Sequence, residues 1–145
     1  MTNATLRKFG FPDRTIRRYE HWCVLLRPAQ ATLGSLVLGA LSEVESFAQL
    51  PPQAFAELAM VIPDIEHGLK AFRAYDKINY LMLMMVDPNV HFHVLPRYRA
   101  AQEFAGMSFP DKGWPGQPDL SVSPVLTAAQ SNDLRDAIRS HWRSD

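Results

Sequence analysis

The sequence predicts an α+β domain with an antiparallel sheet, and three observations lead to this class. Residues 22–27 and 35–40 are short apolar runs separated by a turn, which is typical of a β-hairpin. Residues 51–74 place large apolar side chains three or four positions apart, which predicts an amphipathic helix. Two further apolar runs, 77–86 and 90–97, flank a segment of turn-forming residues and predict a second pair of strands.

The composition is that of one globular domain spanning residues 1–145. At 145 residues with 47% hydrophobic content, the chain can bury a sizeable core without disulfides. Its 15 basic and 15 acidic residues give a net charge of +0, so no global field attracts nucleic acid. There is one cysteine, and no apolar stretch approaches the roughly 20 residues that span a bilayer. We therefore expect a cytoplasmic protein that binds neither nucleic acid nor a membrane.

Each element has its own local signals. The first strand stops before Pro28, and the helix begins at Pro51 and Pro52, with Pro63 expected to bend it midway. The helix is expected to bury its apolar stripe, which consists of Phe55, Leu58, Ile62, Ile65, Leu69 and Phe72.

The second half of the chain is expected to hold the central strand of the sheet. Residues 77–86 are too apolar for a strand with one solvent-exposed face, so we place them at the centre of the sheet. After the return strand, residues 99–124 contain four prolines and three glycines, which predicts a long ordered loop with little regular structure. A last helix begins at Thr127, where Thr127 and Gln130 have the spacing of a capping box.

Two histidines stand out in the return strand. Side chains alternate between the two faces of a strand, so His91 and His93 share one face, while Val90, Phe92 and Val94 form an apolar face that can pack on the helix. Two neighbouring imidazoles each disfavour the other's positive charge. The neutral form is the one that acts as a nucleophile or a metal ligand.

Three interpretations of this pair remain open. Both histidines can be ordinary polar positions of a half-exposed strand. They can also be two ligands of zinc or iron, although no third ligand is evident in the sequence. The third interpretation is nucleophilic catalysis at phosphorus, in which an imidazole nitrogen attacks and is later displaced. We expect no metal and no other cofactor.

The third interpretation agrees with a resemblance to the histidine triad (HIT) family. That family carries His-φ-His-φ-His-φ-φ, where φ is apolar, commonly followed by Pro-Arg. Residues 89–97 read Asn-Val-His-Phe-His-Val-Leu-Pro-Arg, so only the first histidine is replaced, by Asn89. Upstream, residues 30–38 resemble the family's Pro-x-x-x-Gly-His-x-Leu-Val turn and strand, with Ser35 in place of histidine. The resemblance covers residues 19–98, leaving 99–145 as a less similar C-terminal loop and helix.

The resemblance implies a HIT-like antiparallel sheet with one long helix between strands and a C-terminal helix, paired into a homodimer. It also implies a nucleotide or dinucleotide substrate, such as a diadenosine polyphosphate or a phosphoramidate. His91, by position, attacks the α-phosphorus to form a covalent nucleotidyl-histidine that water hydrolyses, and His93 donates a hydrogen bond to the phosphoryl oxygens. The remaining expected substrate contacts are Asn89, Arg27, Ser35, Asp87 and Arg97.

Two departures from the family pattern leave an alternative open. Asn89 cannot carry the charge of a histidine. The glycine-rich turn with a glutamine that usually precedes the triad is replaced by residues 86–88, Val-Asp-Pro, which we expect to join the two strands directly. The chain is therefore either a nucleotide hydrolase or nucleotidyl transferase, or a catalytically weakened nucleotide-binding sensor or interaction module.

Overall fold

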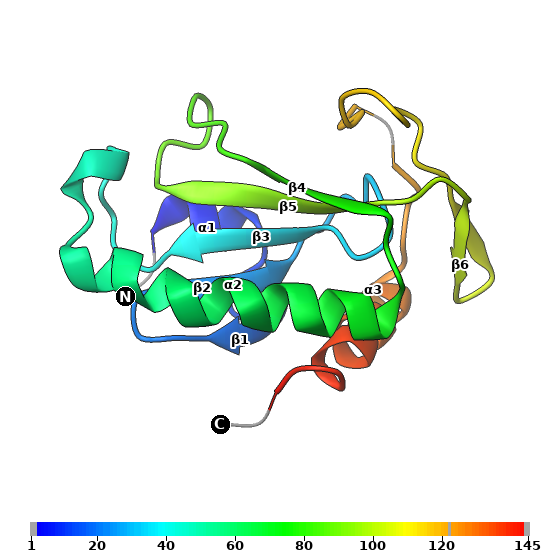
Figure 1. Ribbon diagram of the computed structural model, residues 1–145, viewed down its shortest axis with the longest axis horizontal. Helices are drawn as coiled ribbons and strands as arrows, with labels where there is room; N and C mark the ends of the chain where they lie inside the picture. Colours follow the sequence, from blue (N-terminus) through cyan, green and yellow to red (C-terminus); the bar gives the residue numbers. More distant parts are fainter. Residues whose placement is uncertain (1–2, 122, 144–145) are drawn as a thin grey trace.

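A five-stranded antiparallel sheet forms the centre of the computed structural model, which describes residues 3–121 and 123–143 (Figure 1). Its strand order is β1-β2-β3-β5-β4. The strands are β1 (Thr15–Arg18), β2 (Trp22–Leu26), β3 (Leu36–Ala40), β4 (Lys77–Leu81) and β5 (His91–Arg97). The helices are α1 (Ala4–Lys8), α2 (Pro52–Phe72) and α3 (Ala128–Arg139), with a short 3-10 turn, η1 (Phe47–Gln49), before α2. The α+β class and the predicted hairpin, β2 with β3, are confirmed.

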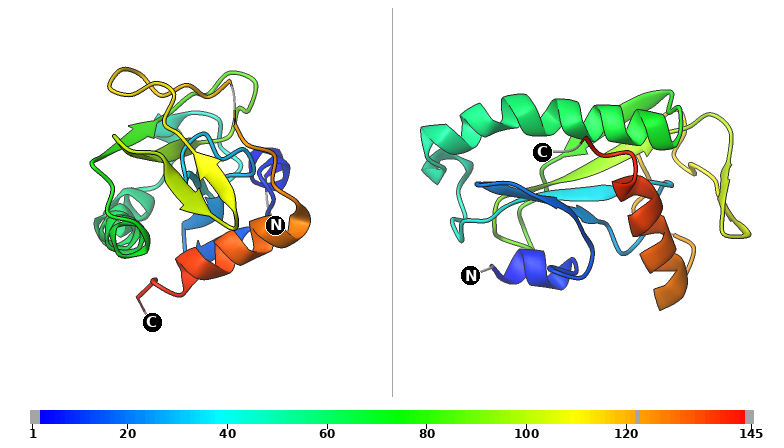
Figure 2. Two further views of the ribbon diagram at one scale, coloured as in Figure 1. Left: turned by 90° about the vertical axis from the view of Figure 1, so that its right-hand side faces the viewer. Right: turned by 90° about the horizontal axis from the view of Figure 1, so that it is seen from below.

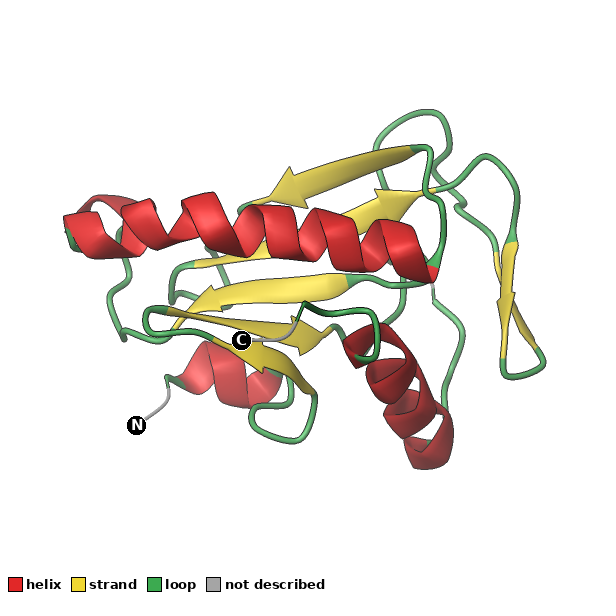
Figure 3. Ribbon diagram, turned by 60° about the horizontal axis from the view of Figure 1, so that its bottom comes forward, coloured by secondary structure: helices red, strands yellow, loops and turns green. Residues whose placement is uncertain are grey.

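The two faces of the sheet carry different helices. α2 lies along one face and α1 lies on the other (Figure 2). α3 packs beside β1 near one end of the sheet (Figure 3). The larger core lies between the sheet, α2 and α3, and a smaller one, formed by Leu6, Cys23, Leu25 and Val37, lies under α1. The sheet is therefore buried on both sides at its centre.

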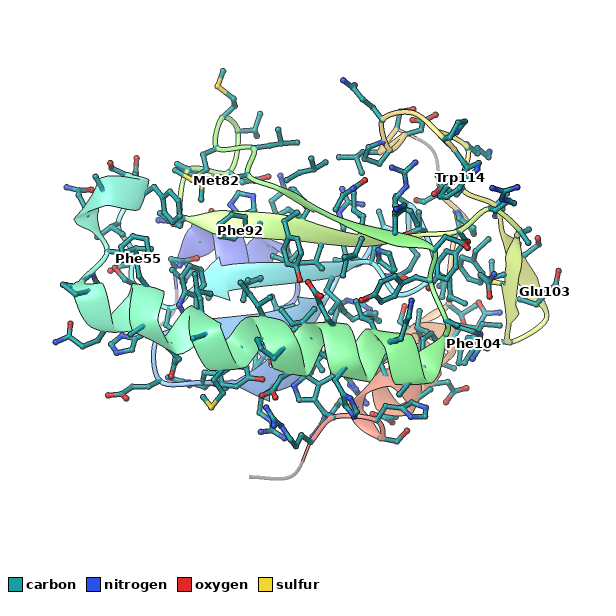
Figure 4. All side chains as sticks on the ribbon, viewed as in Figure 1. Phe55, Met82, Phe92, Glu103, Phe104 and Trp114 are labelled. Carbon is teal, nitrogen blue, oxygen red and sulfur yellow. The ribbon has the colours of Figure 1, made fainter. Side chains whose placement is uncertain are left out.

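The α2 helix confirms the periodic pattern but corrects its orientation. It starts with proline in its first turn and contains Pro63, as expected. The side chains that it buries against the sheet include Val61, Ile65 and Leu69, whereas Phe55 is 40% exposed. Phe55 lies near the start of α2 (Figure 4) and packs against Phe47. The expectation that Phe55 belongs to the buried stripe was wrong, because in the first turn of α2 the neighbouring Ala54 faces the core and its carbonyl oxygen accepts a hydrogen bond from Trp22 Nε1 of β2.

The expectation for residues 77–86 was wrong in its position. β4 ends at Leu81 and forms an edge of the sheet, paired only to β5. Residues 82–90 then form a loop, so Val86, Asp87 and Pro88 do not join the strands directly. Met85 and Val86 are 87% and 85% exposed. The apolar composition of the run had indicated a central strand, but half of it lies outside the sheet.

β5 occupies the position between β3 and β4. Gly39 lies opposite His91, and Val37 lies opposite His93, in the antiparallel register with β3. Val94 belongs to the core beneath α2. His91 and His93 therefore face α1, which confirms the predicted separation of an imidazole face from an apolar face.

The segment 99–124 contains one element that we did not expect. β6 (Gln102–Phe104) and β7 (Met107–Phe109) form a separate hairpin, whose turn places Ala105 and Gly106 at φ of 52° and 77°. Positive φ at both central residues is typical of two-residue hairpin turns. α3 begins as predicted, with the reciprocal Thr127–Gln130 capping box.

The N-terminal elements α1 and β1 were also not predicted. Asn3 caps α1 by accepting a hydrogen bond from the Leu6 amide, and Leu6 is buried. Within the part of the chain that the structure describes, no helix has both the length and the apolar character needed to cross a bilayer.

Candidate functional site

The two histidines of β5 lie side by side beneath α1. Their ring centroids are 5.1 Å apart and the rings are nearly perpendicular, at 85°. His91 is 0% exposed and His93 is 5% exposed. Both side chains are therefore almost completely removed from solvent.

A backbone carbonyl sets the tautomer of His91. Nδ1 of His91 lies 2.7 Å from the carbonyl oxygen of Asn89. A carbonyl oxygen only accepts hydrogen bonds, so Nδ1 must carry the proton. The neutral ring then has its lone pair on Nε2, which is the arrangement that a nitrogen nucleophile requires.

An arginine sets the opposite tautomer in His93. Arg27 is the residue that follows β2, and its Nε donates a hydrogen bond to Nδ1 of His93 at 3.1 Å. A guanidinium has no acceptor atom, so Nδ1 of His93 is unprotonated and its Nε2 carries the hydrogen. Burial, together with the charge of Arg27 and the neighbouring His91, lowers the pKa of His93 to about 4. His93 is consequently a neutral hydrogen-bond donor at pH 7.

Phe9, which follows α1, covers both rings. Its ring centroid lies 5.8 Å from that of His91 and 5.5 Å from that of His93. Nε2 of His91 is buried and has no hydrogen-bond partner among residues 3–121 and 123–143. A buried nitrogen without a partner is rare in proteins.

A cleft of about 320 Å³ opens beside this pair. Two cationic side chains, Lys8 and Arg27, line it together with His93 and Asp87. Lys8 Nζ donates to a carboxylate oxygen of Asp87 at 2.6 Å across its rim. The remaining wall is apolar and is formed by Phe9, Leu83, Met85, Val86 and Leu120. Such a lining offers contacts to both an anionic group and an apolar group.

Asn89 lies behind the site and does not line the cleft. It is 6% exposed, and its side chain is bonded to Thr5 and to the carbonyl oxygen of Glu43. The structure thus places Arg27 and Asp87 beside His93, while it gives Asn89 contacts within the protein.

Two other expected contacts lie away from the histidines. Ser35 is 0% exposed, and its hydroxyl donates to the carbonyl oxygen of Thr32 within the turn between β2 and β3. Arg97 ends β5 and is held by the Asp111 carboxylate, at 2.6 and 3.0 Å, and by Asn79. It borders a second cavity beside Trp114. In Figure 4, Trp114 lies at the opposite end of the β4–β5 pair from Met82 of the 82–90 loop. Neither side chain faces the cleft, because turn and loop contacts hold both elsewhere.

The metal alternative finds no ligand set in the described part of the chain. No three histidine, cysteine, aspartate or glutamate side chains there lie close enough to hold one ion. His91 and His93 are instead engaged with Asn89 and Arg27 through their Nδ1 atoms.

Sequence reasoning missed the N-terminal residues that complete the site, namely Thr5, Lys8 and Phe9. Asn3, a favoured helix-capping residue, and Gly10, a favoured helix-ending residue, were the signals for a short helix before residue 11. Nothing local indicated that this helix lies over the histidines.

Comparison with solved structures finds close similarity of fold. A histidine triad protein from Sinorhizobium meliloti 1021 has a TM-score of 0.73 at 19% identity, over 94% of this chain and 92% of its own. A histidine triad protein from Bradyrhizobium japonicum has a TM-score of 0.71 at 19% identity, over 97% and 96%. This chain has the histidine triad fold.

A third histidine triad structure, a hypothetical nucleotide-binding protein from Sulfolobus tokodaii strain 7, has a TM-score of 0.65 at 18% identity, over 88% of this chain and 82% of its own. No family model and no curated protein sequence matches the chain. The resemblance is therefore confirmed at the level of the histidine triad fold.

Proposed function

We propose that this chain is a nucleotide hydrolase or nucleotidyl transferase of the histidine triad type. Nε2 of His91 attacks the α-phosphorus of a nucleoside phosphate derivative, a phosphorus–nitrogen bond forms, and the bond to the leaving group breaks. Water or another acceptor then displaces the imidazole. The observation that carries this proposal is the 2.7 Å contact between His91 Nδ1 and the Asn89 carbonyl, which leaves the lone pair on Nε2.

The neighbouring groups suit the charge that develops on the phosphoryl oxygens. His93 offers the hydrogen on its Nε2, because Arg27 occupies its Nδ1. Arg27 adds a positive charge beside the same cleft. Donors and charges that are already in position stabilise such a transition state without reorganisation.

Phe9 has to move before this reaction can occur. A reacting phosphorus must approach to about 3–3.5 Å of the attacking nitrogen. Nε2 of His91 is enclosed, and His91 is not among the residues that line the cleft. Rotation of the Phe9 ring away from His91 would extend the cleft to the nucleophile.

The same enclosure favours the second candidate function, a nucleotide-binding sensor or interaction module. In that case a nucleotide would occupy the cleft beside His93 and Arg27 while His91 stays covered by Phe9. Binding without a covalent adduct separates this candidate from the enzyme.

The deciding experiment incubates the protein with adenosine phosphoramidate and with diadenosine polyphosphates, and searches by mass spectrometry for a nucleotidyl adduct. We expect the adduct to form on His91. In His91→Ala, both the adduct and turnover should be lost. His67→Ala removes an exposed histidine on α2 and is the matched control. Turnover that persists unchanged in His91→Ala would exclude the nucleophile. Which leaving group turns over fastest identifies the substrate class.

We further propose that the chain forms a homodimer, as the resemblance implies. Light scattering of the purified protein measures its mass directly, and a mass of one chain at all concentrations would exclude the dimer.

A further inference from the structure

The helix α1 fits closely onto the sheet opposite the nucleophile. A Cβ atom at Gly39 would lie 2.4 Å from Leu6 Cδ2, so the glycine provides the space that Leu6 occupies. Asn3 Nδ2 donates to the carbonyl oxygens of Ala40 and Ser42, both at 2.9 Å. Gly39 is also the register partner of His91. The helix is therefore seated directly beside the histidine strand.

Asn89 joins this helix to the strand. Its Oδ1 accepts hydrogen bonds from Thr5 Oγ1 at 2.9 Å and from the backbone N–H of Thr5 at 3.3 Å. The backbone N–H of Asn89 donates to Thr5 Oγ1 at 3.2 Å. Its Nδ2 donates to the Glu43 carbonyl at 2.7 Å, and its carbonyl accepts from His91 Nδ1. Every polar group of Asn89 is thus hydrogen-bonded, and its contacts reach both α1 and the nucleophile.

A histidine at this position could not make the same set of bonds. A neutral imidazole has one donor and one acceptor on ring nitrogens, whereas the Asn89 amide accepts twice at one oxygen and donates from the adjacent nitrogen. The site is 6% exposed, so the larger ring would also have to displace its neighbours.

We infer that Asn89 is a positioning residue of this site. Its side chain holds α1 in place through Thr5, and its backbone carbonyl sets the tautomer of His91. A histidine at this position therefore lowers function. Asn89 acts through its neighbours and does not touch the substrate. The effect on turnover rests on the proposed function, whereas the effect on the tautomer does not.

The test records the side-chain nitrogen resonances of His91 by NMR at pH 7, where Nδ1-protonated and Nε2-protonated rings differ. We expect the wild-type ring to be protonated at Nδ1, and Asn89→His to give a mixture of tautomers. Thr5→Val, which keeps the shape of threonine but loses the hydroxyl, should also give the mixture, and Thr5→Ser should restore the wild-type spectrum. Turnover should fall about tenfold in Asn89→His and Thr5→Val, the effect of losing one well-placed hydrogen bond.

Thr127→Val is the matched control, since it removes the capping hydroxyl of α3 and leaves the His91 contacts in place. A loss of resolved His91 signals in this control as well would show a general loosening and overturn the inference. An unchanged tautomer in Thr5→Val, or an Asn89→His protein with equal or higher turnover, would also overturn it. If Asn89→His does not fold, the Thr5→Val and Thr5→Ser pair decides. If the wild type has no turnover while the tautomers shift as expected, the proposed function fails and the positioning role stands.

Discussion

Acid should destabilise this protein through His93. In the folded state the pKa of His93 is about 4, in place of the ordinary 6.5, because the ring is buried and lies beside the charge of Arg27. The unfolded chain therefore takes up this proton near pH 6.5 and the folded chain only near pH 4. Between these two values the unfolded state binds more protons, so the free energy of unfolding falls as the pH is lowered.

The size of the effect follows from the difference between the two pKa values. A group that titrates at about 4 when folded and at 6.5 when unfolded changes the stability by about 3 kcal/mol over that interval. The contribution is complete above pH 6.5 and is lost by pH 4. His93 is only 5% exposed, so solvent screens little of this effect.

The assay is urea unfolding at intervals of half a pH unit from about pH 7.5 to about pH 4.5, in the wild type and in His93→Phe. Carboxylates also titrate at the acid end, so the relevant quantity is the difference between the two proteins. That difference should grow by about 1 kcal/mol per pH unit below pH 6.5. Arg27→Met removes a positive charge from beside the ring, raises the pKa of His93, and should reduce the loss.

His67→Gln is the control for this measurement, because His67 is exposed on α2. It should show the same pH dependence as the wild type. Equal slopes in the wild type and His93→Phe would refute the reasoning, since they would mean that His93 is freely protonated in the folded protein.

Three further predictions concern the packing around the histidines and the buried ion pair of Arg97. Phe9→Ala should uncover His91 and increase the rate at which diethyl pyrocarbonate modifies it, measured by mass spectrometry. The substitution should lower the free energy of unfolding by about 1–2 kcal/mol. An unchanged modification rate would contradict the covering role of Phe9. Gly39→Ala should clash with Leu6, lower stability by about 1–3 kcal/mol and increase amide hydrogen exchange in α1, whereas wild-type exchange there would show that α1 is not seated as described. Asp111→Ala should leave Arg97 buried without its carboxylate and lower the free energy of unfolding by about 3–5 kcal/mol in urea titrations, and a loss below 1 kcal/mol would show that water reaches the guanidinium.

The sequence by itself was enough for features that depend on local periodicity. Alternation along β5 placed His91 and His93 on one face and Val94 on the other, because successive side chains of any strand point in opposite directions. The period of α2 and the Thr127–Gln130 capping box were also predictable, since each involves residues within a few positions of one another.

Only the tertiary structure decided which segments meet. An apolar run at 77–86 is compatible with a central strand or with an edge strand and a loop, and pairing partners far along the chain selected the second. Arg97 forms an ion pair with Asp111, a loop residue that belongs to no recognisable sequence motif. The contact of Thr5 with Asn89 spans 84 positions, and the contact of Phe9 with His91 spans 82. The sequence therefore determined which nitrogen-bearing side chains share a face, and the three-dimensional packing of distant segments determined their tautomers and their burial.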